Sequence, residues 1–346
     1  MTIPSTVDLE PPVSSTDPAA TRRRTRPAPR RLTPRAAFIL RRTGRAVVSL
    51  AIVVVATFGI VHLVPGDPVR AALGPSATPE LVASTRAQLG LDQSPVQQFW
   101  NYVTNLLHGD LGVSLQTHRE VTVTLTERLP ATLTLALGAF ILAATGALAI
   151  GIATAVSTQA HRHRRTNTVV SWLLGASIAV PELLVSIGLV ALFGVTLGVL
   201  PVAGWGSPSQ SLLPIAALAL GPMAYLARIV HVEMLTVLDT PYLTTARSKR
   251  LPARLLYLRH ALPNMITGAL TAGGLVLTGM VASTVVIETV FAIPGLGTTI
   301  VSSITGKDYP MIQGVVLVYA ALVLGLNLLV DVILASIDPR SSILEG

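Results

Sequence analysis

The side chains that could do chemistry in this chain are few and widely separated. No cysteine is present among the 346 residues, which excludes disulfides and cysteine-based metal sites. The apolar segments contain no paired aspartates, no serine–histidine pair and no His-Glu-x-x-His pattern at catalytic spacing. We therefore predict that the protein is not an enzyme and that this chain has no catalytic residue, no metal site and no bound cofactor.

The lysines decide whether the chain could bind a nucleotide. A phosphate-binding loop needs a lysine followed by serine or threonine after a glycine-rich turn. The only lysines are Lys249, which precedes Arg250, and Lys307, which precedes Asp308. The chain therefore contains no phosphate-binding loop of its own.

Two glutamates in apolar surroundings are candidates for contact with a solute. Glu182 follows Pro181, and Glu288 lies near the end of a long apolar segment. Because an ionisable group in a membrane is energetically costly, each glutamate requires a physical reason. Either could line a translocation path and meet the ammonium group of a peptide. The alternative is a hydrogen bond to another helix or to backbone, and we favour that alternative for Glu288.

Composition places these residues in a membrane protein. Hydrophobic residues make up 51% of the chain and charged residues only 12%, too few to coat a soluble protein of this size. The net charge of +8 comes from arginines beside apolar segments, without interleaved aromatic residues. That pattern is typical of contact with anionic lipid rather than nucleic acid.

Six apolar segments have roughly the 20-residue length that a bilayer requires. They cover residues 46–64, 131–156, 169–192, 212–230, 269–290 and 311–337. We therefore predict an all-α polytopic fold with six transmembrane helices. Pro181 removes a backbone hydrogen bond and should kink or break the third helix.

Loop charges predict the orientation of the chain. The arginine-rich N-terminal tail and the loops near residues 161–165 and 231–264 are basic, whereas the loop 65–130 is not. Because basic loops stay inside, both termini should be cytoplasmic and the loop 65–130 extracytoplasmic. We expect residues 1–40 to be a disordered tail and residues 41–342 to be the membrane domain.

The long extracytoplasmic loop should contain structure of its own, because connections of this length are usually functional or folded. We predict a helix over residues 79–90 and another over 95–107. Phe99, Trp100 and Tyr102 could anchor the second helix at the outer membrane surface. A platform for a solute-binding protein is one hypothesis for this loop.

The basic loop 231–264 resembles the cytoplasmic signature of ABC importer permeases. That signature reads Glu-Ala-Ala, three residues, Gly, nine residues, and Ile-x-Leu-Pro. Ala246, Leu262 and Pro263 match it in type and spacing. Thr244 and Thr245 stand where Glu and Ala are usual, and Arg250 stands where Gly would permit a left-handed turn.

Further motifs resemble the dipeptide, oligopeptide and nickel permease family, and its first (B-type) dipeptide permease subunit in particular. They run in order along the chain and include Pro65-Gly66-Asp67-Pro68, Gly109-Asp110-Leu111-Gly112, Arg128-Leu129-Pro130-Ala131-Thr132-Leu133, Glu288-Thr289-Val290-Phe291, Pro294-Gly295-Leu296-Gly297 and Asp338-Pro339-Arg340.

The resemblance implies the type I ABC importer permease fold and a set of partners. These are a second, homologous permease subunit, two cytoplasmic ABC ATPase subunits that bind ATP and Mg, and an extracytoplasmic solute-binding protein in a bacterial inner membrane. ATPase coupling would occur at a short helix from Tyr242 to about Lys249. The residues implied in coupling are Tyr242, Thr245, Ala246, Arg247, Lys249, Arg250, Leu262 and Pro263. Tyr242 and Ala246, one helical turn apart, would share the face that enters the ATPase, with Leu243 beside them.

The resemblance leaves the solute open. Import of a dipeptide or oligopeptide is the leading interpretation, and nickel complexes, glutathione and haem are alternatives on the same fold. A channel or secondary carrier that needs no ATPase is a different class of function. Inverted repeats or a ladder of charged residues along one span would favour that class.

Overall fold

The computed structural model describes residues 34–63, 68–74, 77–88, 90–159 and 164–337. Most of the predicted N-terminal tail lies outside these residues. Its last part, residues 34–40, is helical rather than disordered, because the first helix already begins at Pro34.

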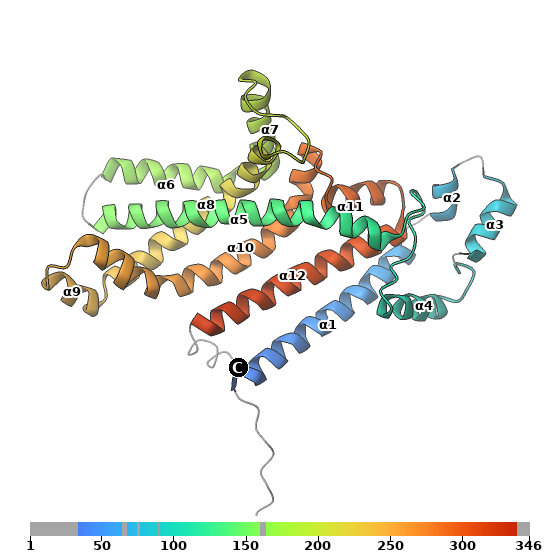
Figure 1. Cartoon of the computed structure of the whole chain (residues 1–346), viewed down its shortest axis with the longest axis horizontal. Coiled ribbons are helices and arrows are strands. Elements are labelled where there is room, and N and C mark those ends of the chain that lie inside the picture. Colours follow the sequence, from blue (N-terminus) through green and yellow to red (C-terminus); the bar gives the residue numbers. More distant parts are fainter. Residues whose placement is uncertain (1–33, 64–67, 75–76, 89, 160–163, 338–346) are drawn as a thin grey trace, which may run out of the picture.

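The described part of the chain is helical almost throughout (Figure 1). Its only pairing of extended backbone joins Val113 to Glu120. The helices are α1 (Pro34–Leu63), α2 (Pro68–Leu73), α3 (Pro79–Gln88), α4 (Pro95–Leu107), α5 (Val121–Gln159), α6 (Arg164–Ala179), α7 (Glu182–Leu189) with the π-helical turn η1 (Val190–Thr196), α8 (Pro208–Leu238), α9 (Pro241–Ser248), the π-helical turn η2 (Leu255–Ala261), α10 (Leu262–Phe291), α11 (Leu296–Thr305) and α12 (Tyr309–Ile337).

Five stretches of the described chain are long and apolar enough to cross a membrane as single helices. They lie in α1, α5, α8, η2 with α10, and α12. The third predicted span is instead broken at Pro181, where the chain bends by 105° between α6 and α7. The predicted break is therefore confirmed, and six spans result if the bent pair counts as one.

The bent pair leads the chain away from α9. α6 begins near the end of the molecule that holds α9, whereas α8 begins beside α7, away from that end (Figure 1). After η1, the backbone N–H of Gly204 donates to the carbonyl of Phe291, the last residue of α10, over 2.9 Å. Trp205 packs there against buried side chains. The segment that follows the bend is thus fixed to the last turn of α10.

Helices α5 and α8 form the most extensive contact among the described helices. One face of α5 carries a repeat of small residues four apart, and all of them are buried: Ala139, Ala143, Ala147, Gly151 and Ala155. Small side chains allow two helix backbones to approach closely. At Gly151 the fit is closest, because an added Cβ would lie 2.7 Å from the carbonyl oxygen of Ala227 on α8.

Helices α1 and α12 form a second pair along one side of the bundle (Figure 1). Few residues of either helix are buried within this chain. Arg42 of α1 forms a two-pronged ion pair with Asp331 of α12, with 2.5 Å between Nη2 and Oδ1. The paired charges explain why an aspartate is tolerated in a span.

The long loop after α1 contains the helices predicted for it. α4 covers Pro95–Leu107, as predicted, and α3 ends at Gln88. α4 is held to the end of α1 by aromatic contacts, since the Phe58 ring lies 5.2 Å from the Phe99 ring and 6.1 Å from that of Tyr102. Trp100 stays exposed. This loop ends earlier than predicted, because α5 starts at Val121.

Candidate functional site

Helix α9 stands at one end of the molecule, between the end of α8 and η2 (Figure 1). Thr240 precedes it in an extended conformation and Pro241 is its first residue, so the chain turns sharply before the helix starts. The span-length helical stretches continue further than predicted, to Leu238 on one side and from Leu255 on the other. The part of the predicted loop outside these stretches is therefore residues 239–254.

Leu243 holds α9 against the bundle. Its side chain is 0% exposed and lies in a cluster with Leu238 and Met234 of α8, Leu256 of η2 and Ala155 of α5. The prediction that Leu243 shares the outward face with Tyr242 is therefore wrong. Leu243 is the only large aliphatic residue of α9, and this was the sequence signal for an inward anchor.

Ala246 and Arg247 also contact the bundle, although Arg247 stays exposed. Ala246 is half-buried and packs against the Leu243 cluster. The guanidinium of Arg247 donates to the carbonyl of Leu238, at the C-terminus of α8, over 3.0 Å. A cation at the C-terminus of a helix satisfies a terminal carbonyl and interacts favourably with the helix dipole. Arg247 thus stabilises the junction between α8 and α9, a contact that sequence reasoning missed.

The opposite face of α9 is exposed. Thr245 and Lys249 are exposed. Tyr242 is 43% exposed, and its hydroxyl donates to the carbonyl of His260 over 3.3 Å. Leu262 is half-buried against the Leu243 cluster, and Pro263 is exposed in the first turn of α10. Of the predicted residues, Ala246 and Leu262 are half-buried, and the exposed ones are Tyr242, Thr245, Arg247, Lys249, Arg250 and Pro263.

Arg250 adopts the backbone conformation that glycine has in the signature. Its φ angle is +54°, in the left-handed region, and its N–H donates to the carbonyl of Arg247 over 2.8 Å. The left-handed turn after α9 is therefore kept even though the residue carries a side chain. Non-glycine residues adopt this conformation at a cost of about 1–2 kcal/mol.

Glu288 is completely buried and caps a helix. Its carboxylate accepts hydrogen bonds from the Thr132 hydroxyl (2.6 Å) and from the N–H groups of Gly297 (2.6 Å) and Thr298 (3.2 Å). Thr132 in turn accepts from the N–H of Leu296 over 2.9 Å. The carboxylate thus satisfies the free N–H groups at the start of α11. This is the alternative that we favoured from sequence, and Glu288 presents no surface to a path in this conformation.

Glu182 occupies a different setting. It is the first residue of α7, directly after the 105° break, and is partly exposed. Its negative charge suits the N-terminus of a helix. Glu182 and Glu288 therefore lie on different helices, and none of the hydrogen bonds of the Glu288 carboxylate given above involves Glu182. A role of Glu182 in a translocation path stays a prediction.

A polar connection at the other end of the molecule joins the long loop to the last helices. The buried carboxylate of Asp308 accepts from the hydroxyl of Ser114 (2.5 Å) and from the N–H of Leu115 (3.1 Å). Gln116 donates to the carbonyl of Gly306 over 3.1 Å. These contacts tie the turn at residues 113–120 to the connection between α11 and α12.

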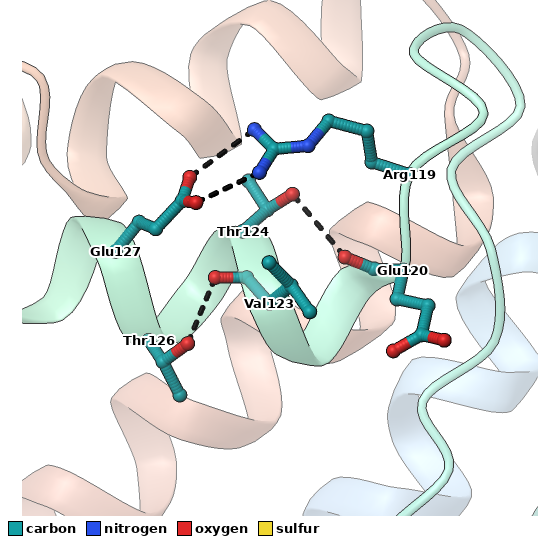
Figure 2. A network of polar contacts seen from close by, with 6 residues as sticks. All are labelled: Arg119, Glu120, Val123, Thr124, Thr126 and Glu127. Atoms are coloured by element: carbon teal, nitrogen blue, oxygen red, sulfur yellow. Dashed lines mark hydrogen bonds and ion pairs between the residues drawn. The ribbon is translucent and has the colours of Figure 1, made fainter.

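Figure 2 shows the outer side of this turn, where Arg119 reaches Glu127 on α5 with two hydrogen bonds of 2.7 and 3.1 Å. The bond to Glu127 raises the pKa of the Arg119 guanidinium. Thr124 and Thr126 donate to the carbonyls of Glu120 and Val123 within the first turns of α5. Both charged groups are half exposed, and such pairs contribute little stability.

Comparison with known proteins supplies the family. Residues 147–343 match the model of the binding-protein-dependent transport system inner membrane component, and residues 36–136 match the N-terminal model of such membrane components. The first match covers more than half of the chain. The chain belongs to this permease family. It is thus a multi-pass inner membrane protein and a permease subunit of an ABC importer, which confirms the resemblance read from the sequence.

Two relatives align over nearly their whole length with this permease. A Brucella abortus (strain 2308) protein named as a peptide transport system permease is 38% identical over 88% of this chain and 98% of its own. The glutathione transport system permease protein GsiC of Salmonella choleraesuis (strain SC-B67) is 36% identical over 87% and 97%.

A solved structure shows the same fold at lower identity. A chain of the inward-facing MetNI methionine ABC transporter superposes on this permease with a TM-score of 0.52 at 17% identity. The match covers 62% of this chain and 96% of the other. The predicted ABC importer permease fold is therefore confirmed.

Proposed function

We propose that this permease forms half of the translocation pathway of an ATP-driven peptide importer. Its partners would be a second homologous permease, two cytoplasmic ATPase subunits that bind ATP and Mg, and an extracytoplasmic solute-binding protein. The family supports ATPase and solute-binding partners in general. The basic N-terminal tail and the charged segment around α9 support cytoplasmic termini.

The observation that carries the proposal is the two-sided setting of α9. Its inner face is fixed to α5 and α8 through Leu243, while Tyr242, Thr245 and Lys249 remain exposed at the end of the molecule. A short helix held in this way can transmit the closure of an attached ATPase to the spans. Such coupling requires that the ATPase bind the two conformations with different affinity.

Peptide is the favoured solute class. The Brucella relative carries a peptide-transport name. Glutathione is the second candidate, because it is itself a tripeptide and GsiC, a named glutathione permease, aligns over nearly its whole length. Nickel complexes and haem have no such relative among those compared above.

Substituting the exposed face of α9 tests the coupling. In the reconstituted transporter, Thr245→Asp should lower the ATP hydrolysis stimulated by binding protein and peptide about tenfold or more, because the added charge disrupts the docked face. The permease should remain in the membrane, since Thr245 contributes nothing to the Leu243 cluster. Thr245→Ser is the matched control and should behave as wild type. Undiminished stimulation with Thr245→Asp would refute coupling through this face.

A direct transport assay separates the classes of function. Vesicles that hold the whole transporter should accumulate dipeptide only with ATP and the binding protein. Uptake without the ATPase subunits would instead indicate a channel or secondary carrier.

A further inference from the structure

A groove of about 900 Å³ opens between α5, α6 and α8 in the half of the bundle nearer α9. This volume falls within the range of about 300–1,000 Å³ that is usual for ligand sites. The residues that line the groove are Thr154, Thr158, Asn167, Thr168, Ser171, Trp172, Gly175, Ala176, Ala179 and His231.

Polar groups from all three helices meet in this groove. Asn167 of α6 donates to the hydroxyl of Thr158 on α5 over 3.1 Å, and the hydroxyl of Thr154 lies 2.9 Å from Nδ1 of His231 on α8. These contacts use Nδ2 of Asn167 and Nδ1 of His231. The amide oxygen of Asn167 and Nε2 of His231 are thereby left to a bound molecule. Together they offer both hydrogen-bond donors and acceptors.

The groove extends along α6 from its start to the break in the third span. From Asn167 to Ala179 the helix axis covers roughly 18 Å, slightly more than half of a hydrocarbon core of about 30 Å. It ends where the chain bends by 105° after Ala179. Most of the surface that lines the groove is apolar, and the hydroxyl, amide and imidazole groups are set within it, which is the usual composition of a small-molecule site.

We propose that this groove is the α9-side section of the solute path and that it binds the backbone of a small peptide in transit. A peptide backbone presents amide donors and carbonyl acceptors, which match Asn167, Ser171 and His231. No lining residue carries a formal charge when histidine is neutral. The lining therefore suits the uncharged amide groups of a peptide backbone better than a phospholipid phosphate, which arginine and lysine usually bind.

The inference rests on the proposed peptide import and is tested in the complete transporter with dialanine as the probe. Ser171→Trp would fill the groove from the exposed face of α6. We expect dialanine uptake to fall about tenfold or more, while the amount of assembled transporter and the ATPase activity stimulated by binding protein persist. Uptake by Ser171→Trp at the wild-type rate would refute the role of the groove in the solute path and would leave the proposed peptide import unaffected. Absence of dialanine uptake in the wild type would refute the proposed function as well.

Cysteine labelling provides a second measurement that does not rely on a loss of activity. Because the chain has no cysteine, Ser171→Cys adds the only thiol of this subunit. In inside-out vesicles, a cationic water-soluble thiol reagent should label it roughly tenfold faster than Leu173→Cys, because a thiol in apolar surroundings rarely ionises. Leu173 is 62% exposed on the same helix and lies outside the groove.

The occupant is identified by protection of that thiol. With binding protein and ATP present, dialanine should slow the labelling of Ser171→Cys, and Leu173→Cys should be unaffected. Equal labelling rates at the two positions would overturn the proposal. Protection by added phosphatidylglycerol, but not by dialanine, would also overturn it and would assign the groove to lipid.

Discussion

At the scale of single residues, two polar positions show how the fold uses a side chain. Arg250 takes a left-handed backbone conformation, and Glu288 satisfies the N-terminus of α11 from inside the bundle. Neither role can be read from the residue type alone. Each depends on where the neighbouring backbone goes.

Replacing Arg250 separates its backbone role from its side-chain role. Arg250→Gly should preserve coupled ATP hydrolysis within about twofold, since glycine relieves the cost of the left-handed conformation. Arg250→Val should reduce coupling, because β-branched residues strongly disfavour this conformation. Loss of coupling with glycine would mean that the guanidinium itself contacts a partner.

Replacing Glu288 tests its structural role. In the wild type, the Thr132 hydroxyl donates to the Glu288 carboxylate. Glu288→Gln keeps the size of the side chain but places an amide donor against that hydroxyl. We expect a loss of about 1–3 kcal/mol in stability, measured as a lower thermal midpoint of the purified permease in detergent. Solute preference should not change. Normal stability combined with an altered KM for peptide would restore the predicted role in the path.

At the scale of elements, the α5–α8 contact depends on small residues and α9 depends on this contact. Ala155 of α5 and Met234 of α8 both belong to the cluster that holds Leu243. The pattern of small residues four apart is visible in the sequence. Its partner helix is not, because many pairings of apolar helices satisfy the same pattern.

Two glycine-to-alanine changes measure the tightness of this contact. Gly151→Ala should lower the thermal midpoint markedly, because the new Cβ would lie 2.5 Å from Val230 and 2.7 Å from the Ala227 carbonyl. Gly279→Ala on α10 is the matched control, with no atom within 4 Å of the added Cβ. Alanine there should stabilise the helix by up to about 1 kcal/mol. Equal effects at both sites would contradict a close α5–α8 contact.

Helix boundaries were predictable where local signals are strong. Ser94 and Pro95 mark the start of α4, and Ser94 accepts from the N–H of Gln97 over 3.4 Å. Pro181 marked the break in the third span. The bend angle and the packing partners of Leu243 were not predictable, because they depend on packing between segments far apart in the chain.

At the scale of the whole molecule, the two ends of the bundle differ. One carries α9 and the other carries α2–α4, which are attached through Phe58 and the Ser114–Asp308 contact (Figure 1). That the protein is a membrane protein, and where its spans lie, was predictable from the length of the apolar segments. Partners and solute were not, because the residues that determine them face other chains.

Removing the helices of the outer loop tests whether they serve transport. Deletion of residues 80–107 should lower peptide uptake, while the ATPase subunits still co-purify with the permease from the opposite end. The measurement is uptake per assembled transporter. Full uptake after the deletion would show that α3 and α4 are dispensable.

The contrast between the two helix pairs has a mechanical consequence. Through its row of small residues, Ala139 to Ala155, α5 packs closely on α8 along about 24 Å of its length, which is about 58 Å for 39 residues. A displacement applied at α9 should therefore be transmitted along this paired region of α5 and α8. α1 and α12 are buried little within this chain and form the compliant side of the bundle. Amide exchange should therefore be slow along α5 and α8 and faster along α1. During the conformational change of the transporter, α5 and α8 should move as one unit relative to α1 and α12.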